Sequence, residues 1–242
     1  MIYEIAGLRI KIEHQYDFTS KFCKDYLSND QTSDADIAVS VTAEDFAIEK
    51  AFSSGFSDGY IENICLYRNI CTQIPVLNRI LLHSAVLEYD GKGYAFLGRS
   101  GTGKSTHARL WKKYLRTPKM INGDKPILQF TGDEFLAHGT PWRGKESWGI
   151  RANAPLCGLC FLEQARENSI RKLSPAEVST RLLGQILLPK TEENVAATLE
   201  LADKLIKTVP AYLLKCDVSK EAVRCSFEAL TGLSFAEREW KE

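Results

Sequence analysis

A length of 242 residues allows one large domain, or a core with a smaller appendage, and 44% hydrophobic residues supply a packed interior. The 31 basic residues balance 31 acidic ones without forming a basic stripe, which argues against a nucleic-acid partner. No apolar run approaches the roughly 18 residues of a membrane span, which argues against a membrane partner.

The first 80 residues carry no chemical signature, and we expect residues 1–80 to form an α/β cap or packing layer on a core over residues 81–242. Alternating apolar and polar residues predict a strand or hairpin within residues 1–12. A turn-rich segment then precedes a predicted strand over 36–42, and helical spacing of apolar residues predicts a helix over 62–78.

Two strand-like runs follow, over 82–89 and 93–97, and they are joined by Asp90-Gly91-Lys92-Gly93. Asp-Gly between two apolar runs is a strong hairpin signal, and so short a connection joins only antiparallel strands. The strand over 93–97 therefore has an antiparallel neighbour. Common P-loop proteins place the equivalent strand in a parallel, doubly wound sheet, so the hairpin favours a less common fold.

The run from Gly98 to Ser105 fits the phosphate-binding pattern G-x-x-x-x-G-K-[ST] without departure. Its glycines let backbone N–H groups turn towards phosphate oxygens, Lys104 reaches the β- and γ-phosphates, and the Ser105 hydroxyl can bind Mg²⁺. The pattern predicts that a nucleoside triphosphate and Mg²⁺ bind here, and the resemblance described below implies that the cofactors are ATP and Mg²⁺. The expected nucleotide-binding residues are Gly98, Arg99, Ser100, Gly101, Thr102, Gly103, Lys104, Ser105 and Thr106.

A segment dense in turn formers and charges follows at 138–146. The positive charges of Arg143 and Lys145 would neutralise a phosphoryl group or an anionic substrate. Trp142 either stacks on a ligand or packs. The alternative is a surface loop with solvated charges.

The remainder alternates strands and helices. We expect strands over 127–130, 156–162 and 211–218. The Ser174-Pro175-Ala176-Glu177 capping box starts a helix. Apolar residues at helical spacing predict two further helices, around 195–206 and 223–230.

Seven cysteines, an odd number, are scattered through apolar segments, which favours a reducing cytoplasm over a disulfide framework. The start of the chain, Met1 to Glu4, lacks the basic and apolar parts of a signal peptide. Cys157 and Cys160 form a C-x-x-C pair inside a predicted strand, where alternation puts their sulfurs on opposite faces. Packing is therefore favoured over a redox or zinc pair.

His83, the hairpin and the loop from Gly98 resemble, in that order, the catalytic domain of HPr kinase/phosphorylase. The loop also resembles that of ATP-dependent phosphoenolpyruvate carboxykinase, which shares the fold. The segments N-G-D-K-P at 122–126 and G-T-P-W-R-G-K at 139–145 match a group of uncharacterised HPr-kinase-like proteins. The resemblance implies an α/β fold with a P-loop nucleotide-binding core, in which helices flank a mixed sheet containing antiparallel strands.

The resemblance also implies roles for single residues. His83 lies near the transferred phosphoryl group, although a strand histidine satisfied by backbone is the alternative. Asp124 aligns with the second member of an acidic pair and would hold Mg²⁺ together with Ser105. The expected catalytic residues are His83, Lys104, Asp124, Arg143 and Lys145.

Gly123 stands where HPr kinase has the first acidic residue, which supplies its general base. The resemblance therefore leaves the identity of the general base undecided. The candidates are Asp124 itself, Asp133, Glu146 and a substrate carboxylate. Weaker site candidates lie before and at the end of the strand over 156–162, namely Arg151, Asn153 and Glu163.

The leading hypothesis is an HPr-kinase-like phosphotransferase that moves the ATP γ-phosphoryl group to a hydroxyl. The acceptor would be a serine of a small protein or peptide, or a small metabolite. The alternative, favoured by Gly123, is a nucleotide-binding regulatory protein with little or no catalysis. A carboxykinase, with His107 or His138 as a metal ligand, is a third hypothesis, and the resemblance is compatible with a homo-oligomer.

Overall fold

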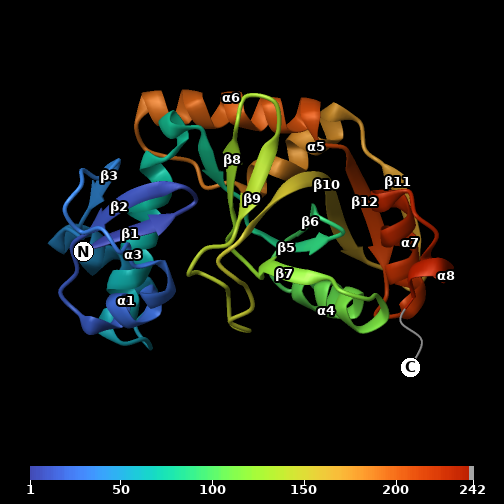
Figure 1. Cartoon of the computed structure of the whole chain (residues 1–242), viewed down its shortest axis with the longest axis horizontal. Coiled ribbons are helices and arrows are strands. Elements are labelled where there is room, and N and C mark those ends of the chain that lie inside the picture. The colour runs from blue at the N-terminus through green and yellow to red at the C-terminus, as the bar shows by residue number, and fades with distance from the viewer. Residues whose placement is uncertain (240–242) are drawn as a thin grey trace. The chain divides into compact units, whose positions relative to one another are not determined.

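The computed structural model describes residues 1–239 and divides into two compact units. Unit 1 consists of Met1–Leu77 and Leu188–Thr198. Unit 2 consists of Asn78–Leu187 and Leu199–Glu242, and it contains the predicted phosphate-binding loop from Gly98 to Ser105. Figure 1 shows the elements of both units in their chain colours.

Unit 1 is built on a small sheet in the order β1-β2-β3, with β1 (Ile2–Ile5) antiparallel to β2 (Leu8–Ile12) and β3 (Ile37–Val39) parallel to β2. Ala6 and Gly7 form the tight turn of the first hairpin, both with positive φ, as such turns require. The hairpin and the strand expected over 36–42 are confirmed. The helices of the unit are α1 (Asp17–Phe22), α2 (Ala43–Phe52) and α3 (Asp58–Gln73).

Helix α3 begins earlier than the predicted 62–78 because Ser57 caps it, accepting a hydrogen bond from the Tyr60 N–H. Helix α2 was not predicted, although Thr42 caps it in the same way. Glu49 is the buried residue of this helix, and its apolar residues do not follow helical spacing. The helix predictions rest on that spacing, so α2 was missed.

Within residues 1–239, nine strands form the sheet of unit 2. They are β4 (Arg79–Leu81), β5 (Ser84–Tyr89), β6 (Lys92–Leu97), β7 (Lys119–Asn122), β8 (Ile127–Phe130), β9 (Phe135–His138), β10 (Asn153–Gln164), β11 (Ser169–Lys172) and β12 (Ala211–Cys216). Along the main path the order is β4-β8-β9-β10-β6-β5-β7, and β12 lies between β10 and β11. Most neighbours are antiparallel, whereas the long strand β10 runs parallel to both β6 and β12.

The predicted hairpin before the loop is present. Strand β5 pairs antiparallel with β6, and Tyr89 lies opposite Lys92 across a turn in which Asp90 and Gly91 have positive φ. The loop therefore follows a strand with one antiparallel and one parallel neighbour. The expectation of a mixed sheet around the loop is confirmed.

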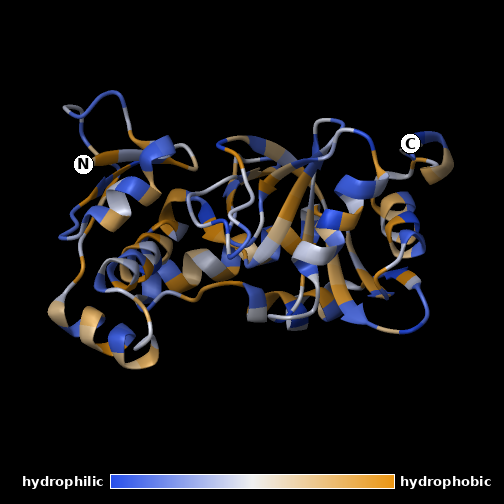
Figure 2. Ribbon diagram, turned by 90° about the horizontal axis from the view of Figure 1, so that it is seen from below, coloured by the Kyte–Doolittle hydropathy of each residue, from blue (hydrophilic) through white to orange (hydrophobic). Residues whose placement is uncertain are grey.

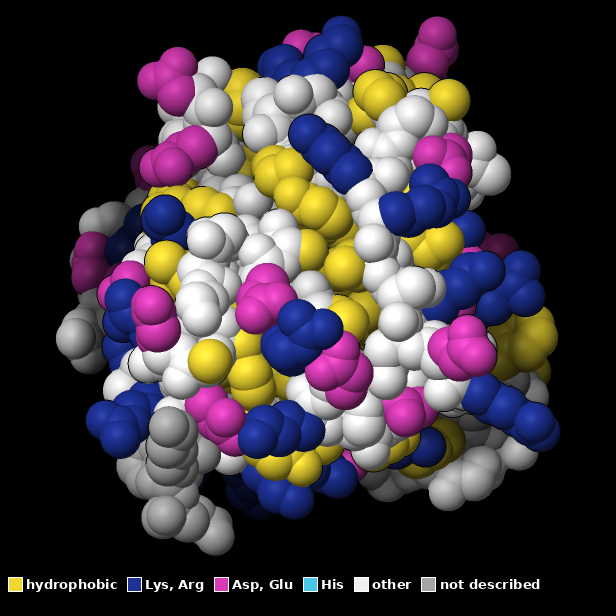
Figure 3. Space-filling model, turned by 90° about the vertical axis from the view of Figure 1, so that its right-hand side faces the viewer, with side chains coloured by type: hydrophobic (Ala, Val, Ile, Leu, Met, Phe, Trp, Pro, Cys, Tyr) yellow, Lys and Arg dark blue, Asp and Glu magenta, His cyan; other side chains and the backbone are white. Residues whose placement is uncertain are grey.

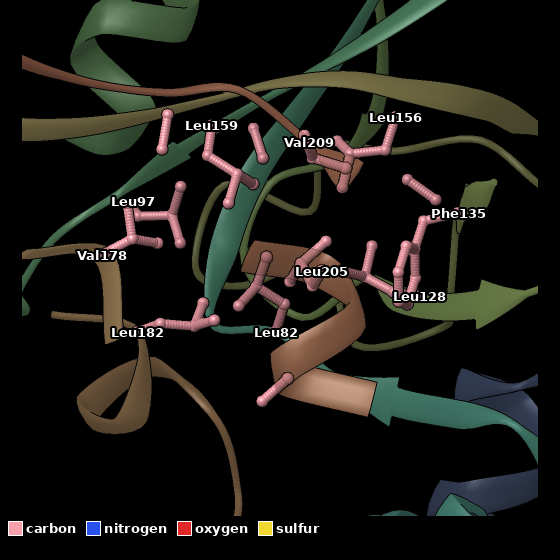
Figure 4. Packing of buried hydrophobic residues seen from close by; sticks show 14 of the residues in the cluster. Leu82, Leu97, Leu128, Phe135, Leu156, Leu159, Val178, Leu182, Leu205 and Val209 are labelled. Atoms are coloured by element: carbon pink, nitrogen blue, oxygen red, sulfur yellow. The ribbon is translucent and has the colours of Figure 1, made fainter. Parts of the chain in front are cut away.

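Helices cover both faces of this sheet (Figure 1). They are α4 (Lys104–Tyr114), α5 (Pro175–Leu182), α6 (Glu192–Thr208), α7 (Lys220–Thr231) and α8 (Phe235–Arg238). On one face, Leu182 of α5 and Leu205 of α6 pack on strand residues such as Leu97, as Figure 4 shows. On the other face, Trp111 of α4 and Phe227 of α7 meet edge to face. The α/β fold class with helices flanking the sheet is confirmed.

The expected placement of the C-x-x-C pair is wrong. Both Cys157 and Cys160 pack against the cluster that contains Trp111 and Phe227. The register of β10 against β6 shifts between Leu156 and Gly158, and this bulge breaks the alternation of side chains. All cysteines among the described residues are free.

Figure 2 shows hydrophobic colours along the strands of the large sheet and changing colours around the helices, as expected for a layered core. On the face in Figure 3, basic and acidic side chains are interspersed, with hydrophobic ones between them. On α7, for example, Arg224 pairs with Glu221 and Glu228. None of the helices in the described part of the chain has the length and apolar character needed to cross a bilayer.

Candidate functional site

The phosphate-binding loop connects the end of β6 to the start of α4, as predicted. Gly98 has a φ of +150°, and a Cβ there would lie 2.6 Å from Oγ1 of Thr102. That hydroxyl donates to the Arg99 carbonyl at 2.8 Å and tightens the loop. Gly103, with a φ of +100°, directly precedes α4. The loop thus needs glycine where the pattern has it.

Lys104 is the first residue of α4 and is buried. Its Nζ donates to the Gly98 carbonyl at 2.8 Å and lies 3.4 Å from the Arg99 carbonyl. Burial lowers the pKa of Lys104, and the carboxylate of Asp124 acts in the opposite direction. The ammonium group is therefore held against the backbone of the loop.

Asp124 follows β7 and is held between two cationic or potentially cationic side chains. Its Oδ1 lies 3.1 Å from Nε2 of His83, and its Oδ2 accepts from Nζ of Lys125 at 2.9 Å. Burial raises the pKa of Asp124, but the hydrogen bonds from His83 and Lys125 outweigh it and lower the pKa to about 2. The carboxyl group is ionised at neutral pH.

A buried amide fixes the turn that carries Asp124. Oδ1 of Asn122 accepts from the backbone N–H groups of Asp124 and Lys125, at 2.9 and 2.7 Å. Nδ2 of Asn122 donates to Oγ1 of Thr140 at 3.0 Å, and that hydroxyl donates to the Lys125 carbonyl at 2.7 Å. A network with its members satisfied in this way makes the turn rigid. Sequence reasoning missed Asn122, Lys125 and Thr140 as site residues.

Gly123 has no room for a side chain. A Cβ there would lie 2.9 Å from the Arg143 carbonyl and 3.2 Å from the Trp148 carbonyl. The Gly123 N–H donates to that Trp148 carbonyl at 2.9 Å. The close approach of the 143–148 segment therefore requires glycine, and an acidic residue at this position would displace the segment.

His83 lies just before β5 rather than inside the predicted strand. Its backbone N–H donates to the Gln185 carbonyl at 2.8 Å, so its backbone is anchored while its ring contacts Asp124. The alternative of a strand histidine satisfied by backbone does not describe this ring, which hydrogen-bonds to a carboxylate.

One pocket of about 570 Å³, here called the Asp124 pocket, brings together the five predicted catalytic residues. They are His83, Lys104, Asp124, Arg143 and Lys145. Ser100, Gly101, Gly103, Ser105 and Thr106 of the nucleotide-binding set also line it, as do Lys125 and Glu146. Gly98, Arg99 and Thr102 line neighbouring hollows of the same loop instead.

The segment after Thr140 supplies the outer wall of this pocket. Trp142 is buried, so it packs rather than offering its ring to a ligand. Nε of Arg143 donates to the Thr140 carbonyl at 3.4 Å, and Lys145 is exposed. Glu146 pairs with Arg109 of α4 at 3.2 Å. The segment is thus tied to the helix that follows the phosphate-binding loop.

Several weaker candidates lie elsewhere. Asp133 is exposed in the turn before β9, and neither it nor Arg151 nor Asn153 lines the Asp124 pocket. Glu163 pairs with Arg181 at 2.8 Å in a second pocket of about 880 Å³, which includes Gly98–Thr102.

Ser105 and Asp124 are the residues that could hold a metal. Both line the Asp124 pocket, and a hydroxyl and an ionised carboxylate are oxygen donors of the kind that Mg²⁺ prefers. Neither His107 nor His138 lines this pocket, and the His138 ring is bound to Gln129 at 2.9 Å. Among residues 1–239, no cluster of three or more His, Cys, Asp or Glu residues could form a metal centre.

The chain matches one protein family and is distantly similar to a solved structure. The protein family described as SynChlorMet cassette protein ScmC matches residues 61–223. No curated protein matches the chain. A solved structure of the Hpr(Ser) kinase/phosphatase from Coxiella burnetii is similar, with 13% sequence identity and a TM-score of 0.28, over 52% of this chain and 88% of that one. We therefore infer the chemistry of the site from its own residues.

Proposed function

The chain belongs to the family of the SynChlorMet cassette protein ScmC, and from the residues that meet in its Asp124 pocket we propose that it is an ATP-dependent phosphotransferase. The proposed reaction moves the γ-phosphoryl group of ATP to a hydroxyl. The acceptor is a serine of a small protein or peptide, or a hydroxyl of a small metabolite.

One observation carries the proposal. The loop lysine, the loop serine and an ionised carboxylate from the turn after β7 line the same pocket, together with a histidine that contacts the carboxylate. A protein that only binds phosphate needs the loop alone. The added carboxylate and the cationic side chains of Lys125, Arg143 and Lys145 suit a reaction in which charge builds up on a transferring phosphoryl group.

We assign roles on this basis. Backbone N–H groups of the loop and Lys104 bind the β- and γ-phosphates, and Arg143 and Lys145 neutralise the far side of the phosphoryl group. His83, oriented by Asp124, hydrogen-bonds to the phosphoryl group. Ser105 and Asp124 hold Mg²⁺, which when bound neutralises charge on the β- and γ-oxygens.

Neither Asp124 nor position 123 is well suited to act as the general base. A carboxylate with a pKa of about 2 is a weak base, so Asp124 suits metal binding better than proton transfer. Position 123 cannot supply a second carboxylate without displacing the outer wall. Phosphoryl transfer depends mainly on positioning and charge stabilisation, so catalysis does not require a strong base.

The proposal is tested with γ-labelled ATP, Mg²⁺ and the full chain. Water and a pool of peptides that each contain one serine serve as acceptors. We expect label on peptide, or slow release of labelled phosphate, and Lys104→Met should abolish both. ATP that binds without any loss of its γ-phosphoryl group would overturn the proposal.

That negative outcome is what the alternative function predicts. A nucleotide-binding regulatory protein would bind ATP through the loop and leave it intact. The observation that favours it is Gly123, which leaves the pocket without the second carboxylate of HPr kinase.

A further inference from the structure

The second pocket, of about 880 Å³, opens beside the loop, and we call it the Glu163 pocket. It shares Ser100 and Gly101 with the Asp124 pocket. The two pockets also meet at a hydrogen bond, since Gln185 lines the Glu163 pocket and its carbonyl accepts from the His83 N–H. A molecule in the Glu163 pocket therefore lies next to the place where the loop would hold phosphates.

An acidic and a basic side chain line this pocket together, Glu163 near the end of β10 and Arg181 in α5. Oε1 of Glu163 accepts from Nη1 of Arg181 at 2.8 Å, and the two side chains are 40% and 33% exposed. Nε2 of Gln164 donates to the Gly101 carbonyl at 3.2 Å, which ties the end of the strand to the loop. The pair is thus accessible to a ligand and lies beside the loop.

The pair does not use all of its hydrogen-bonding groups. Among residues 1–239, nothing hydrogen-bonds to Oε2 of Glu163 or to Nε and Nη2 of Arg181. A carboxylate accepts hydrogen bonds, and a guanidinium group only donates them. An acceptor and a donor side by side match the N–H and the C=O groups of a peptide main chain.

A different hollow offers the nucleoside a place beside the loop. A pocket of about 410 Å³ adjoins the loop at Gly101 and Gly103, and Leu110, Leu162 and Val218 give it an apolar lining. Such a lining is typical of a site for a flat organic ring. The Glu163 pocket has about twice that volume and carries the ion pair, so it suits a longer and more polar molecule.

We propose that the Glu163 pocket binds the acceptor of the phosphotransfer, and that this acceptor is a peptide whose main chain hydrogen-bonds to Glu163 and Arg181. This inference rests on the proposed function. It narrows the acceptor to a serine in a peptide or protein segment. Contacts to the main chain determine where the serine lies rather than which residues flank it.

The first test uses the serine peptide that takes most label from γ-labelled ATP in the presence of the full chain. Its backbone amides are methylated one at a time, and each methylation removes one N–H donor. One methylated peptide should show a KM about tenfold higher, since it loses a hydrogen bond to a charged group. In Glu163→Ala, the KM values of that peptide and of its parent should lie within about twofold of each other.

Arg181→Gln tests the donor side of the pair. We expect the KM for the peptide to rise about tenfold, while ATP titrated without peptide binds within about twofold of its affinity for the unaltered protein. Arg224→Gln is the matched control. Arg224 also forms ion pairs on a helix, with Glu221 and Glu228, and it lines none of the three pockets at the loop. This variant should change neither value.

Thr180→Trp covers the case in which Arg181→Gln does not fold. Thr180 is exposed and lines the Glu163 pocket, so an indole at this position fills part of the pocket and leaves the ion pair in place. The KM for the peptide should again rise while the affinity for ATP is kept.

The outcomes separate this inference from the proposed function. An unchanged KM for the peptide in these variants would overturn the inference, and so would weaker ATP binding, which would assign the Glu163 pocket to the nucleoside. Release of labelled phosphate with no label on any peptide would also overturn it, because the acceptor would then not be a peptide. ATP that stays intact in every mixture would overturn the proposed function itself.

Discussion

The two walls of the Asp124 pocket are built on different principles. The loop wall is a stretch of backbone shaped by Gly98 and Gly103 between a strand and a helix, and its pattern predicts that N–H groups face a bound phosphate. The opposite wall presents side chains, above all His83, Asp124 and Lys125, on turns fixed by buried hydrogen bonds.

Because of this difference, the two walls should be sensitive to substitutions at different kinds of position. A backbone wall depends on local conformation and tolerates change in most of its side chains. A side-chain wall depends on supporting contacts such as the hydrogen bond between Asn122 and Thr140, which are 18 positions apart and do not line the pocket. Substitutions in the two walls should therefore have different effects.

In the proposed reaction, Lys104 is the loop side chain that acts directly on the phosphates. We expect Lys104→Met to lower ATP turnover by about 100-fold or more, since one charge-stabilising group is lost. Lys113→Met, on the exposed side of the same helix, should change turnover less than about twofold. Steady-state release of labelled phosphate measures both. Near-normal turnover by Lys104→Met would remove the loop from the mechanism.

Asn122 supports the side-chain wall from beneath. Asn122→Ala leaves two backbone N–H groups and the Thr140 hydroxyl without this partner, so we expect the free energy of unfolding to fall by about 3 kcal/mol. Asn69→Ala, at a partly exposed amide of unit 1, should cost about 0.5 kcal/mol or less. Urea unfolding compares the two. Equal losses would mean that the network does not hold the turn.

Asp124 links the same wall to acid stability. Its pKa drops on folding from the ordinary value of 3.8 to about 2, so it stabilises the fold by about 2 kcal/mol above pH 4, and this is lost as the pH falls from 4 to 2. Asp124→Asn cannot lose that contribution. We therefore expect its free energy of unfolding to fall less than that of the unaltered protein between pH 5 and pH 2. Parallel acid profiles would contradict the two hydrogen bonds to the carboxylate.

Gly123 tests the close packing between the two turns of the side-chain wall. Gly123→Ala should lower the free energy of unfolding by about 1 kcal/mol because its Cβ meets the Arg143 and Trp148 carbonyls. Gly184→Ala, where a Cβ meets nothing within 4 Å, is the control and should be neutral. Chemical denaturation measures the free energy of unfolding of both variants. A stable, more active Gly123→Asp would show that the position can hold a base after all.

The loop wall could be predicted from the sequence because its information is local. The strand, the glycines, Lys104 and Ser105 lie within the 14 residues from Lys92 to Ser105, and each has a physical reason to be where it is. The hairpin before it was equally local, carried by Asp90 and Gly91.

The side-chain wall was predicted only through a resemblance, and its supporting residues were missed. Asn122 and Thr140 lie 18 positions apart, and no period or pattern says that they meet. Lys125 stood beside Asp124 in N-G-D-K-P, a signal that was visible but not used. Alternation likewise misplaced Cys157, because a bulge is a property of strand pairing rather than of one strand.

If both walls bind one Mg²⁺·ATP, as we propose, the affinity for ATP should depend on Mg²⁺ through Asp124. In the unaltered protein, Mg²⁺ should raise the affinity about tenfold or more. In Asp124→Asn, the metal-free affinity should stay the same and most of the Mg²⁺ enhancement should vanish. An undiminished enhancement in Asp124→Asn would show that the carboxylate does not hold the metal, and the two walls would not form one site.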